Sequence, residues 1–95
     1  MNSRIGQLPT DRPARYAKQL TSHWAARGQT VETDGVLTMT WHSGQVIILT
    51  PEAARLVIQV SVPEGGDIEH FAGVVARHLE RFGQRDELQV SWEHP

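Results

Sequence analysis

The fold of this chain is decided by residues 34–66, which read DGVLTMTWHSGQVIILTPEAARLVIQVSVPEGG. Apolar and polar side chains alternate in residues 36–41 and again in residues 56–62, and the β-branched run 46–50 lies between them. A period of two is typical of β-strands that bury one face. The links between these runs are short, and the hairpin dipeptide Asp34-Gly35 precedes the first of them. The stretch therefore predicts consecutive antiparallel strands.

Residues 13–27 have the period of an amphipathic helix. The residues of its apolar face are Tyr16, Leu20 and Trp24. Asp11 precedes the segment as a candidate N-cap, and Gly28 follows it where a left-handed C-cap is expected. The segment therefore predicts a helix, and residues 31–33 after it predict a short strand.

A second helical period covers residues 68–82. Its apolar stripe consists of Ile68, Phe71, Ala72, Val75, Leu79 and Phe82. Asp67 is expected to cap its first turn, and Gly83 is expected to end it. Residues 88–92 then alternate once more and predict a last strand.

These elements predict an α+β fold, a two-layer sandwich in the order helix, four strands, helix, strand. The sheet is expected to be mostly antiparallel, with four to five strands and both helices on one face. Residues 1–10 have no period and contain Gly6 and Pro9, so they predict a flexible N-terminal arm. Residues 11–95 then predict a single domain. The side chains expected to be mostly buried are Tyr16, Leu20, Trp24, Leu37, Met39, Ile58, Phe71, Val75, Leu79 and Phe82.

Composition excludes several classes of function. The 95 residues carry a net charge of −2, which argues against a strongly basic nucleic-acid binder. There is no cysteine, so disulfides, thiolate metal sites and a cysteine nucleophile are excluded. No apolar run approaches the roughly 18 residues of a membrane span, so no membrane contact is expected. The first residues lack the apolar core of a signal peptide, and we expect a cytoplasmic location.

Two blocks of residues point to a known family. The first block contains Ala14-Arg15-Tyr16, Gln19-Leu20 and His23-Trp24, and the second contains His78-Leu79, Arg81-Phe82, Arg85, Glu87-Leu88 and Trp92. From about residue 13 to residue 92, the chain resembles the small bacterial domain-of-unknown-function family 2218.

That family has no assigned function, but its members occur beside or fused to flavin-dependent siderophore-interacting reductases. The resemblance therefore implies an accessory part in siderophore iron utilisation, with such a reductase as partner. No flavin or nicotinamide fingerprint is present in this chain, so no cofactor is expected here.

A candidate ligand site follows from the two histidines of these blocks. His23 and His78 each lie about 60° from the centre of the apolar stripe of their helix, on the same rotational side. Helices packed side by side would place both rings in one groove. Arg81 and Arg85 lie at the end of the second helix, and Trp92 in the last strand would form a wall. This set would suit an anionic or aromatic small molecule.

Other interpretations of these residues remain open. The histidines would be structural if they bond to backbone carbonyls or a carboxylate, with Arg81 and Arg85 paired to Glu80, Asp86 or Glu87. The five histidines have no metal-ligand spacing, so no metal site is expected. An enzyme using His23 and His78 is the second reading of function, because no nucleophile and base stand at recognisable spacing.

A structural protein that forms a homodimer is the third reading. The short last strand and the β-branched residues on both faces of 46–50 predict an open sheet edge that pairs with a second copy. Residues 1–28 also hold five basic residues and one acidic residue. Arg12, Arg15 and Lys18 are interpreted as a solvated helix face, with an acidic partner or nucleic acid as the alternative.

Overall fold

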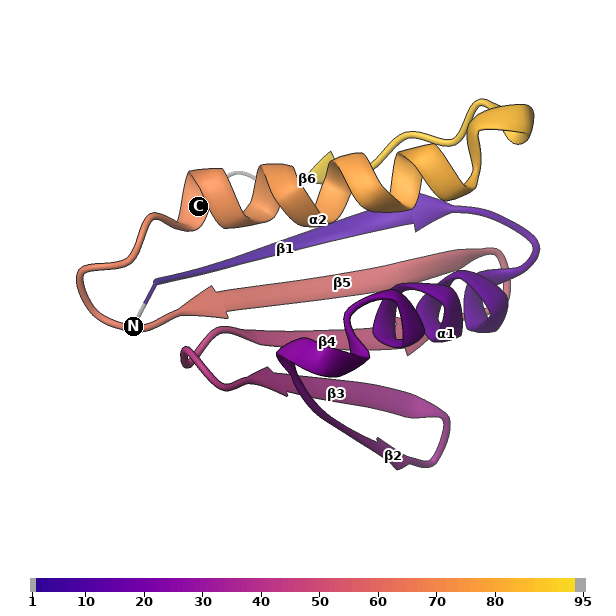
Figure 1. The fold of residues 1–95 in the computed structure, drawn as a ribbon. Helices are drawn as coiled ribbons and strands as arrows, with labels where there is room; N and C mark the ends of the chain where they lie inside the picture. Colours follow the sequence, from indigo (N-terminus) through magenta and orange to yellow (C-terminus); the bar gives the residue numbers. More distant parts are fainter. Residues whose placement is uncertain (1, 94–95) are drawn as a thin grey trace.

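A computed structural model describes residues 2–93 of the chain, which form one six-stranded sheet and two α-helices (Figure 1). The elements are β1 (Asn2–Pro9), α1 (Pro13–His23), a 3₁₀ turn (Ala25–Arg27), β2 (Gly28–Thr33), β3 (Val36–Trp41), β4 (Val46–Pro51), β5 (Arg55–Val62), α2 (Ile68–Phe82), a 3₁₀ turn (Gln84–Asp86) and β6 (Ser91–Trp92). The strand order is β2-β3-β4-β5-β1-β6, and every neighbouring pair is antiparallel. The predicted α+β class is confirmed.

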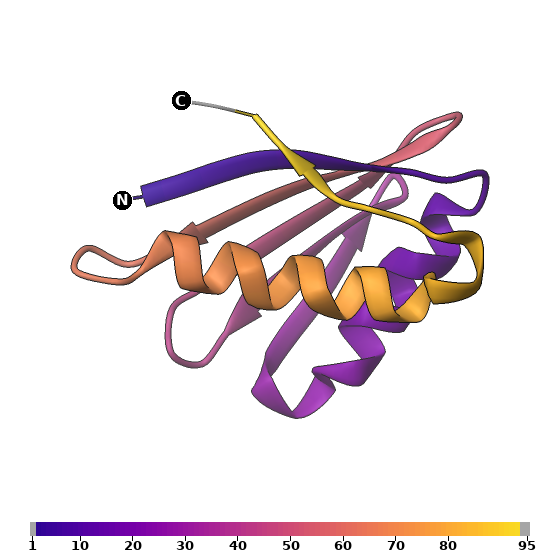
Figure 2. The same cartoon turned by 90° about the horizontal axis from the view of Figure 1, so that it is seen from above.

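Both helices lie on the same face of the sheet, so the molecule has two layers (Figure 2). α1 packs over β3, β4 and β5, whereas α2 packs over β5 and β1. Alternate residues of β3, β4 and β5 point into this interface; in β5 they are Leu56, Ile58, Val60 and Val62. The side chains expected to be buried are buried, except that Phe82 is only half-buried. Neither helix in residues 2–93 is long and apolar enough to cross a bilayer.

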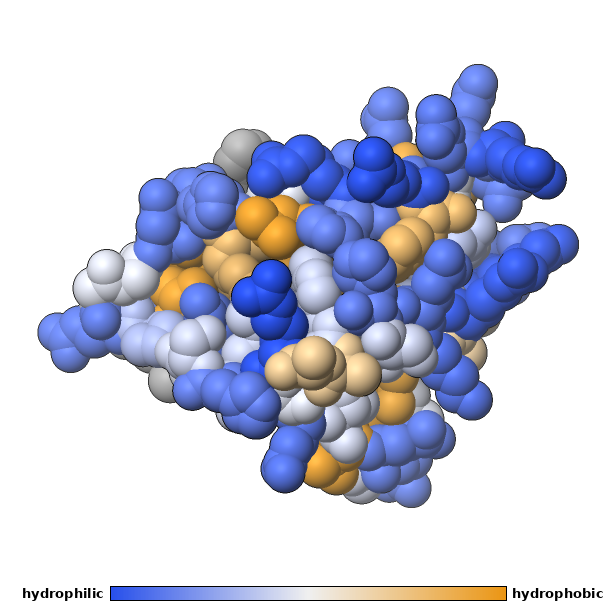
Figure 3. All heavy atoms as spheres, in the orientation of Figure 1, coloured by the Kyte–Doolittle hydropathy of each residue, from blue (hydrophilic) through white to orange (hydrophobic). Residues whose placement is uncertain are grey.

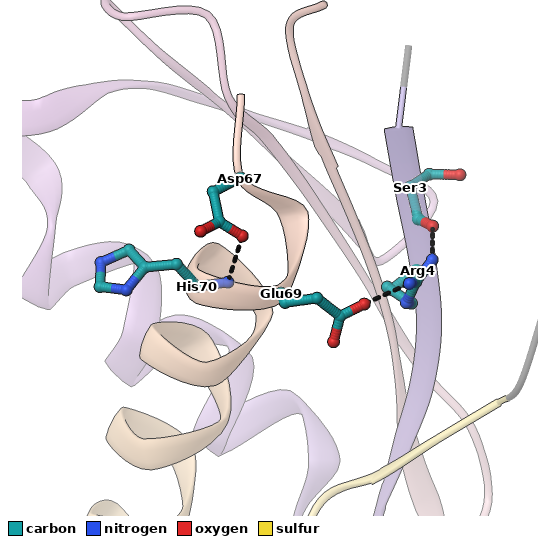
Figure 4. Close-up of polar contacts among 5 residues, drawn as sticks. All are labelled: Ser3, Arg4, Asp67, Glu69 and His70. Carbon is teal, nitrogen blue, oxygen red and sulfur yellow. Dashed lines mark hydrogen bonds and ion pairs between the residues drawn. The ribbon is translucent and has the colours of Figure 1, made fainter. Parts of the chain in front are cut away.

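The prediction of a flexible arm over residues 1–10 is wrong. Residues 2–9 form β1, which pairs with β5 along its whole length. The strand lacks an apolar period because its inward positions hold Asn2, Arg4, Gly6 and Leu8. Arg4 forms an ion pair with Glu69 at the start of α2 (Figure 4), and only Leu8 is a fully buried apolar side chain. The sheet consequently has six strands instead of four to five, and the element order begins with a strand.

The first helix ends earlier than predicted. α1 stops at His23, and a 3₁₀ turn leads to Gly28, which begins β2 with an extended φ of −179°. Gly28 is not a left-handed cap; a Cβ on it would lie 2.0 Å from the carbonyl oxygen of Thr40. Asp11 is not the N-cap, because Arg12 occupies that position. By contrast, Asp67 caps α2 as predicted, since its Oδ1 accepts the N–H of His70 at 3.0 Å (Figure 4).

The edges of the sheet also differ from expectation. β4 was predicted to lie near an open edge, but it lies between β3 and β5. The strand predicted at 31–33 extends over Gly28–Thr33 and forms one edge. The strand predicted at 88–92 is only Ser91–Trp92 and forms the other edge. The N–H of Val90 donates to Glu80 Oε2 at 2.9 Å, so the backbone just before β6 bonds to α2 instead of to the sheet.

Candidate functional site

The structure brings the two predicted histidines together where the end of α1 meets α2. The ring centroids of His23 and His78 are 5.1 Å apart, and His23 lies 5.7 Å from Phe82. The indole of Trp24 lies 4.7 Å from the His78 ring and so supports it from the core side. This contact arises because α1 packs against the C-terminal part of α2: Tyr16 near the start of α1 contacts Asp86 just after α2, and His23 at its end contacts His78 and Phe82.

The two imidazoles have different surroundings. His78 is half-buried, and its Nδ1 lies 2.7 Å from the carbonyl oxygen of Val74. Because a carbonyl only accepts, Nδ1 donates and Nε2 is left for another partner. His23 is exposed, and its ring makes no hydrogen bond within residues 2–93. In this part of the chain, no three His, Asp or Glu side chains are grouped closely enough to hold a metal ion.

An aromatic cluster continues from these histidines into the core. Trp24 meets Trp41 edge to face at 5.0 Å, and Trp41 meets Phe71 in the same way at 5.1 Å. The guanidinium of Arg27 lies 5.6 Å from the Trp41 ring centroid, a distance at which a cation is attracted to the ring face. Two of the three tryptophans are therefore packing residues between the helices and the sheet.

A hollow of about 410 Å³ opens beside this cluster, between the start of α1 and the end of α2. It is lined by Arg12, Arg15, Tyr16, Gln19, Arg81, Phe82, Gly83, Gln84, Arg85 and Asp86. Figure 3 shows hydrophilic side chains on both sides of it, at the right-hand end of the molecule. Four of the lining residues are arginines and one is an aspartate. The hydroxyl of Tyr16 donates to Asp86 Oδ2 over 3.3 Å, which joins the two helix ends across the hollow.

A second hollow of about 620 Å³ adjoins the first along α2. Its lining is Arg77, His78, Glu80, Arg81 and Gln84. Arg81 and Gln84 belong to both hollows, so His78 is connected to the arginines of the first. We refer to the two hollows together as the arginine groove.

The arginines of this groove are largely without acidic partners. Arg12 lies 4.0 Å from Asp11, whereas Arg15, Arg81 and Arg85 have no ion pair within residues 2–93. The alternative in which Arg81 and Arg85 pair with nearby carboxylates is therefore not what the structure shows. Glu80 accepts from the backbone of Val90, and Asp86 accepts from Tyr16.

Trp92 does not belong to the arginine groove. Its indole covers Gly6 at the sheet edge, where a Cβ on Gly6 would lie 2.6 Å from Trp92 Cε3. The segment before β6 bonds to Glu80, whereas His78 faces α1. Trp92 is not among the residues that line either hollow of the groove.

The residues missed from sequence are Arg12 and Arg15, which line the groove opposite Arg81 and Arg85. The available signal was the excess of basic residues in 1–28, which was interpreted as a solvated face. A third hollow of about 300 Å³ lies on the other side of α1, against the β2–β3 turn. It holds Lys18 with Glu32 and Asp34, so its charges are mixed.

Comparison with known proteins identifies the family. The model of a family described as "Uncharacterized protein conserved in bacteria (DUF2218)" matches residues 6–93. The chain belongs to this family. The resemblance seen in the sequence is thus confirmed, and no curated protein matches the chain.

The DUF2218 fold is shared with a solved structure. The NMR structure of PA4090 from Pseudomonas aeruginosa is similar with a TM-score of 0.75 and 22% sequence identity. The match covers 98% of this chain and 96% of that chain. At this identity the similarity shows the fold alone.

Proposed function

We propose that this DUF2218 protein is a binding module whose arginine groove takes an anionic small molecule. The observation that carries the proposal is that four arginines line a hollow of about 410 Å³ in which Asp86 is the single acidic lining residue. Ligand pockets in proteins typically measure about 300–1,000 Å³, so this volume suits a small molecule.

The charges indicate what kind of ligand fits. Guanidiniums held close together repel one another, and a bound anion relieves that repulsion while accepting paired N–H bonds. Because these arginines are exposed, each contact contributes only about 0.2–1 kcal/mol. Several contacts must therefore act together, so we expect a multiply charged ligand that binds with micromolar to millimolar affinity.

The aromatic residues beside the arginines refine this expectation. Phe82 lines the first hollow and His78 lines the second. The ring of His23 lies against the rings of both residues. A ligand that combines acidic oxygens with an aromatic ring would meet complementary groups on each side. Catecholate siderophores belong to this chemical class, and carboxylate siderophores share its acidic oxygens. The family resemblance supports the same choice, with a siderophore-interacting reductase as the partner.

Catalysis by His23 and His78 has less support. An imidazole that acts as a base is normally oriented by a neighbouring group that stabilises its charged form, most often a carboxylate. His78 is oriented by the carbonyl oxygen of Val74 and packs against Trp24, which suits a structural position at the margin of a binding groove.

The proposal is tested by isothermal titration at low ionic strength with citrate, 2,3-dihydroxybenzoate, a ferric catecholate siderophore and inorganic phosphate. We expect at least one of these anions to bind. Arg81→Gln and Arg85→Gln are each expected to weaken that binding by up to about fivefold, equal to about 1 kcal/mol. Arg55→Gln is the matched control, because Arg55 begins β5, away from the groove, and pairs with Glu52 in the preceding turn.

Two carboxylates give a test of the opposite sign. Asp86→Asn removes the negative charge from the first hollow while keeping an acceptor for Tyr16, so anion binding is expected to tighten several-fold. Glu87→Gln changes the net charge equally but does not touch the hollow lining. Equal changes in anion binding for Asp86→Asn and Glu87→Gln, or for Arg81→Gln and Arg55→Gln, would show that only the overall charge of the protein matters and not the groove. Failure of all four anions to bind at millimolar concentration would contradict the proposal.

A further inference from the structure

The face of the sheet opposite the helices is not covered by any part of residues 2–93 (Figure 2). Its residues follow from the register, because directly paired residues point to the same side of a sheet. Leu37, Met39 and their partners point to the helices and are buried, so the residues between them point outward. One outward row crosses five strands and consists of Val31, Thr38, Ile48, Gln59 and Ile5.

This row contains the most exposed large apolar residues of the described chain. Val31 is 61% exposed and Ile5 is 41% exposed, and they are its only exposed large hydrophobic residues. They lie at the two ends of the same row, with half-buried Ile48 between them. Val36, Val46 and Val57 point outward in the neighbouring rows and are half-buried as well. These six apolar residues define what we call the outer face.

The outer face is also nearly free of charge. On β1 to β5, the only charged side chain that points outward is Arg55 at the end of β5, and it is paired with Glu52. All remaining outward positions hold apolar residues, Pro, Thr, Ser or Gln. A surface of this kind can be buried without removing an ion from water.

We propose that a second copy of this chain covers the outer face, so that two sheets stack around a twofold axis. An uncharged patch is complementary to itself, because two copies meet without like-charge repulsion, although each chain carries a net charge of −2. A partner of different chemistry would have no charge pattern on this face to recognise. The inference is independent of the anion site, since the arginine groove lies on the helix side and stays open in such a dimer.

The area agrees with a dimer of moderate affinity. Five strands at about 4.8 Å spacing, with six residues at about 3.3 Å each, give a face of roughly 500 Å² in projection. Two such faces bury about 1,000 Å² of projected area, without the additional area that the uneven surface of the side chains contributes. This value is the lower limit for a specific interface. We therefore expect a micromolar dissociation constant, with the two sheets about 10 Å apart.

Sedimentation equilibrium of the full chain over a range of concentrations provides the test. The wild-type mass is expected to approach twice 10.6 kDa as concentration rises. Val31→Lys places a charge on the outer face and is expected to raise the dimer dissociation constant by at least about tenfold. Thr30→Lys is the matched control; it lies on the same edge strand, is exposed, and points to the helix side because it pairs with Met39.

Each outcome decides the proposal. Weakening by Val31→Lys but not by Thr30→Lys supports stacking through the outer face, and Ile5→Lys on the other side of the sheet should repeat it. Equal weakening by Val31→Lys and Thr30→Lys would indicate pairing along the β2 edge, and no weakening would place the interface elsewhere; both overturn the proposal. A wild-type mass of 10.6 kDa up to millimolar concentration also overturns the proposal, and the outer face would then be a candidate binding surface for a different protein. Circular dichroism of each variant confirms that it is folded.

Discussion

Gly6 is the residue on which the N-terminal strand depends. Its missing side chain leaves room for the indole of Trp92, which closes the end of the core above β1. The same residue prevents prediction of the strand from the sequence, because a glycine at an inward position interrupts the apolar alternation. The glycine that the contact with Trp92 requires is thus also the residue that interrupts the apolar alternation of β1.

At this scale, Gly6→Ala is expected to destabilise the protein by about 1–3 kcal/mol, because the new Cβ overlaps the Trp92 ring. Gly73→Ala in α2 is the control of opposite sign. Its Cβ would meet only the flexible end of Arg77, and alanine stabilises a helix by roughly 0.5–1 kcal/mol relative to glycine. Urea unfolding measures both changes.

The double variant Gly6→Ala/Trp92→Ala separates the Trp92 contact from a general effect on β1. If the ring causes the strain, the two substitutions together cost less than the sum of the single ones. Strict additivity of the unfolding free energies would show that Trp92 is not the cause.

The elements differ in how well the sequence predicts them. α2 and the strands β3, β4 and β5 were predicted almost to the residue, because each has an uninterrupted period and a turn signal at its end. In the β2–β3 hairpin, Asp34 and Gly35 both have positive φ, as that turn requires. β1 and β6 were missed or misjudged because contacts distant in sequence determine them: the Trp92 ring on Gly6, and Glu80 bonded to Val90.

The attachment of β6 to α2 can be tested at Glu80. Glu80→Ala removes the acceptor of the Val90 N–H, and leaving that group without a partner is expected to cost about 1–3 kcal/mol. Glu80→Gln keeps an acceptor and should cost less. Hydrogen exchange of the Glu93 N–H, which donates to the carbonyl of Ile5 at 2.7 Å, should accelerate in the alanine variant first. Unchanged exchange at Glu93 would mean that β6 stays on β1 without this bond.

Across the whole molecule, the packing of α1 against the C-terminal part of α2 assembles the candidate site. It places the start of α1 beside the end of α2, so arginines about 70 positions apart in sequence line one hollow. The periodicity predicted the contact of His23 and His78, since it fixes the rotational position of each ring. It did not place Arg12 and Arg15 or Trp92, because those positions depend on which helix ends meet and on which flank the chain returns.

Deletion of residues 1–9 tests the molecule as a unit. β1 lies between β5 and β6 in the sheet, and Leu8 is fully buried. Its removal exposes the apolar edge of β5 and releases β6, so we expect loss of cooperative thermal unfolding and poor dispersion of the amide NMR signals. A truncated chain that unfolds cooperatively near the wild-type temperature would show that these residues are dispensable, as a flexible arm would be.

The position of β1 in the sheet also sets the timing of assembly during translation. Its residues are made before those of its partner β5, since Pro9 pairs with Arg55 and Asn2 pairs with Val62. Ribosomes add roughly 5–20 residues per second, so the first strand waits for about 2–12 s before its partner has been synthesised. Throughout that interval the meander of β2 to β5 grows while the nascent N-terminal segment remains unpaired. In a cell, this segment is therefore the part of the chain that chaperones and proteases reach for the longest time.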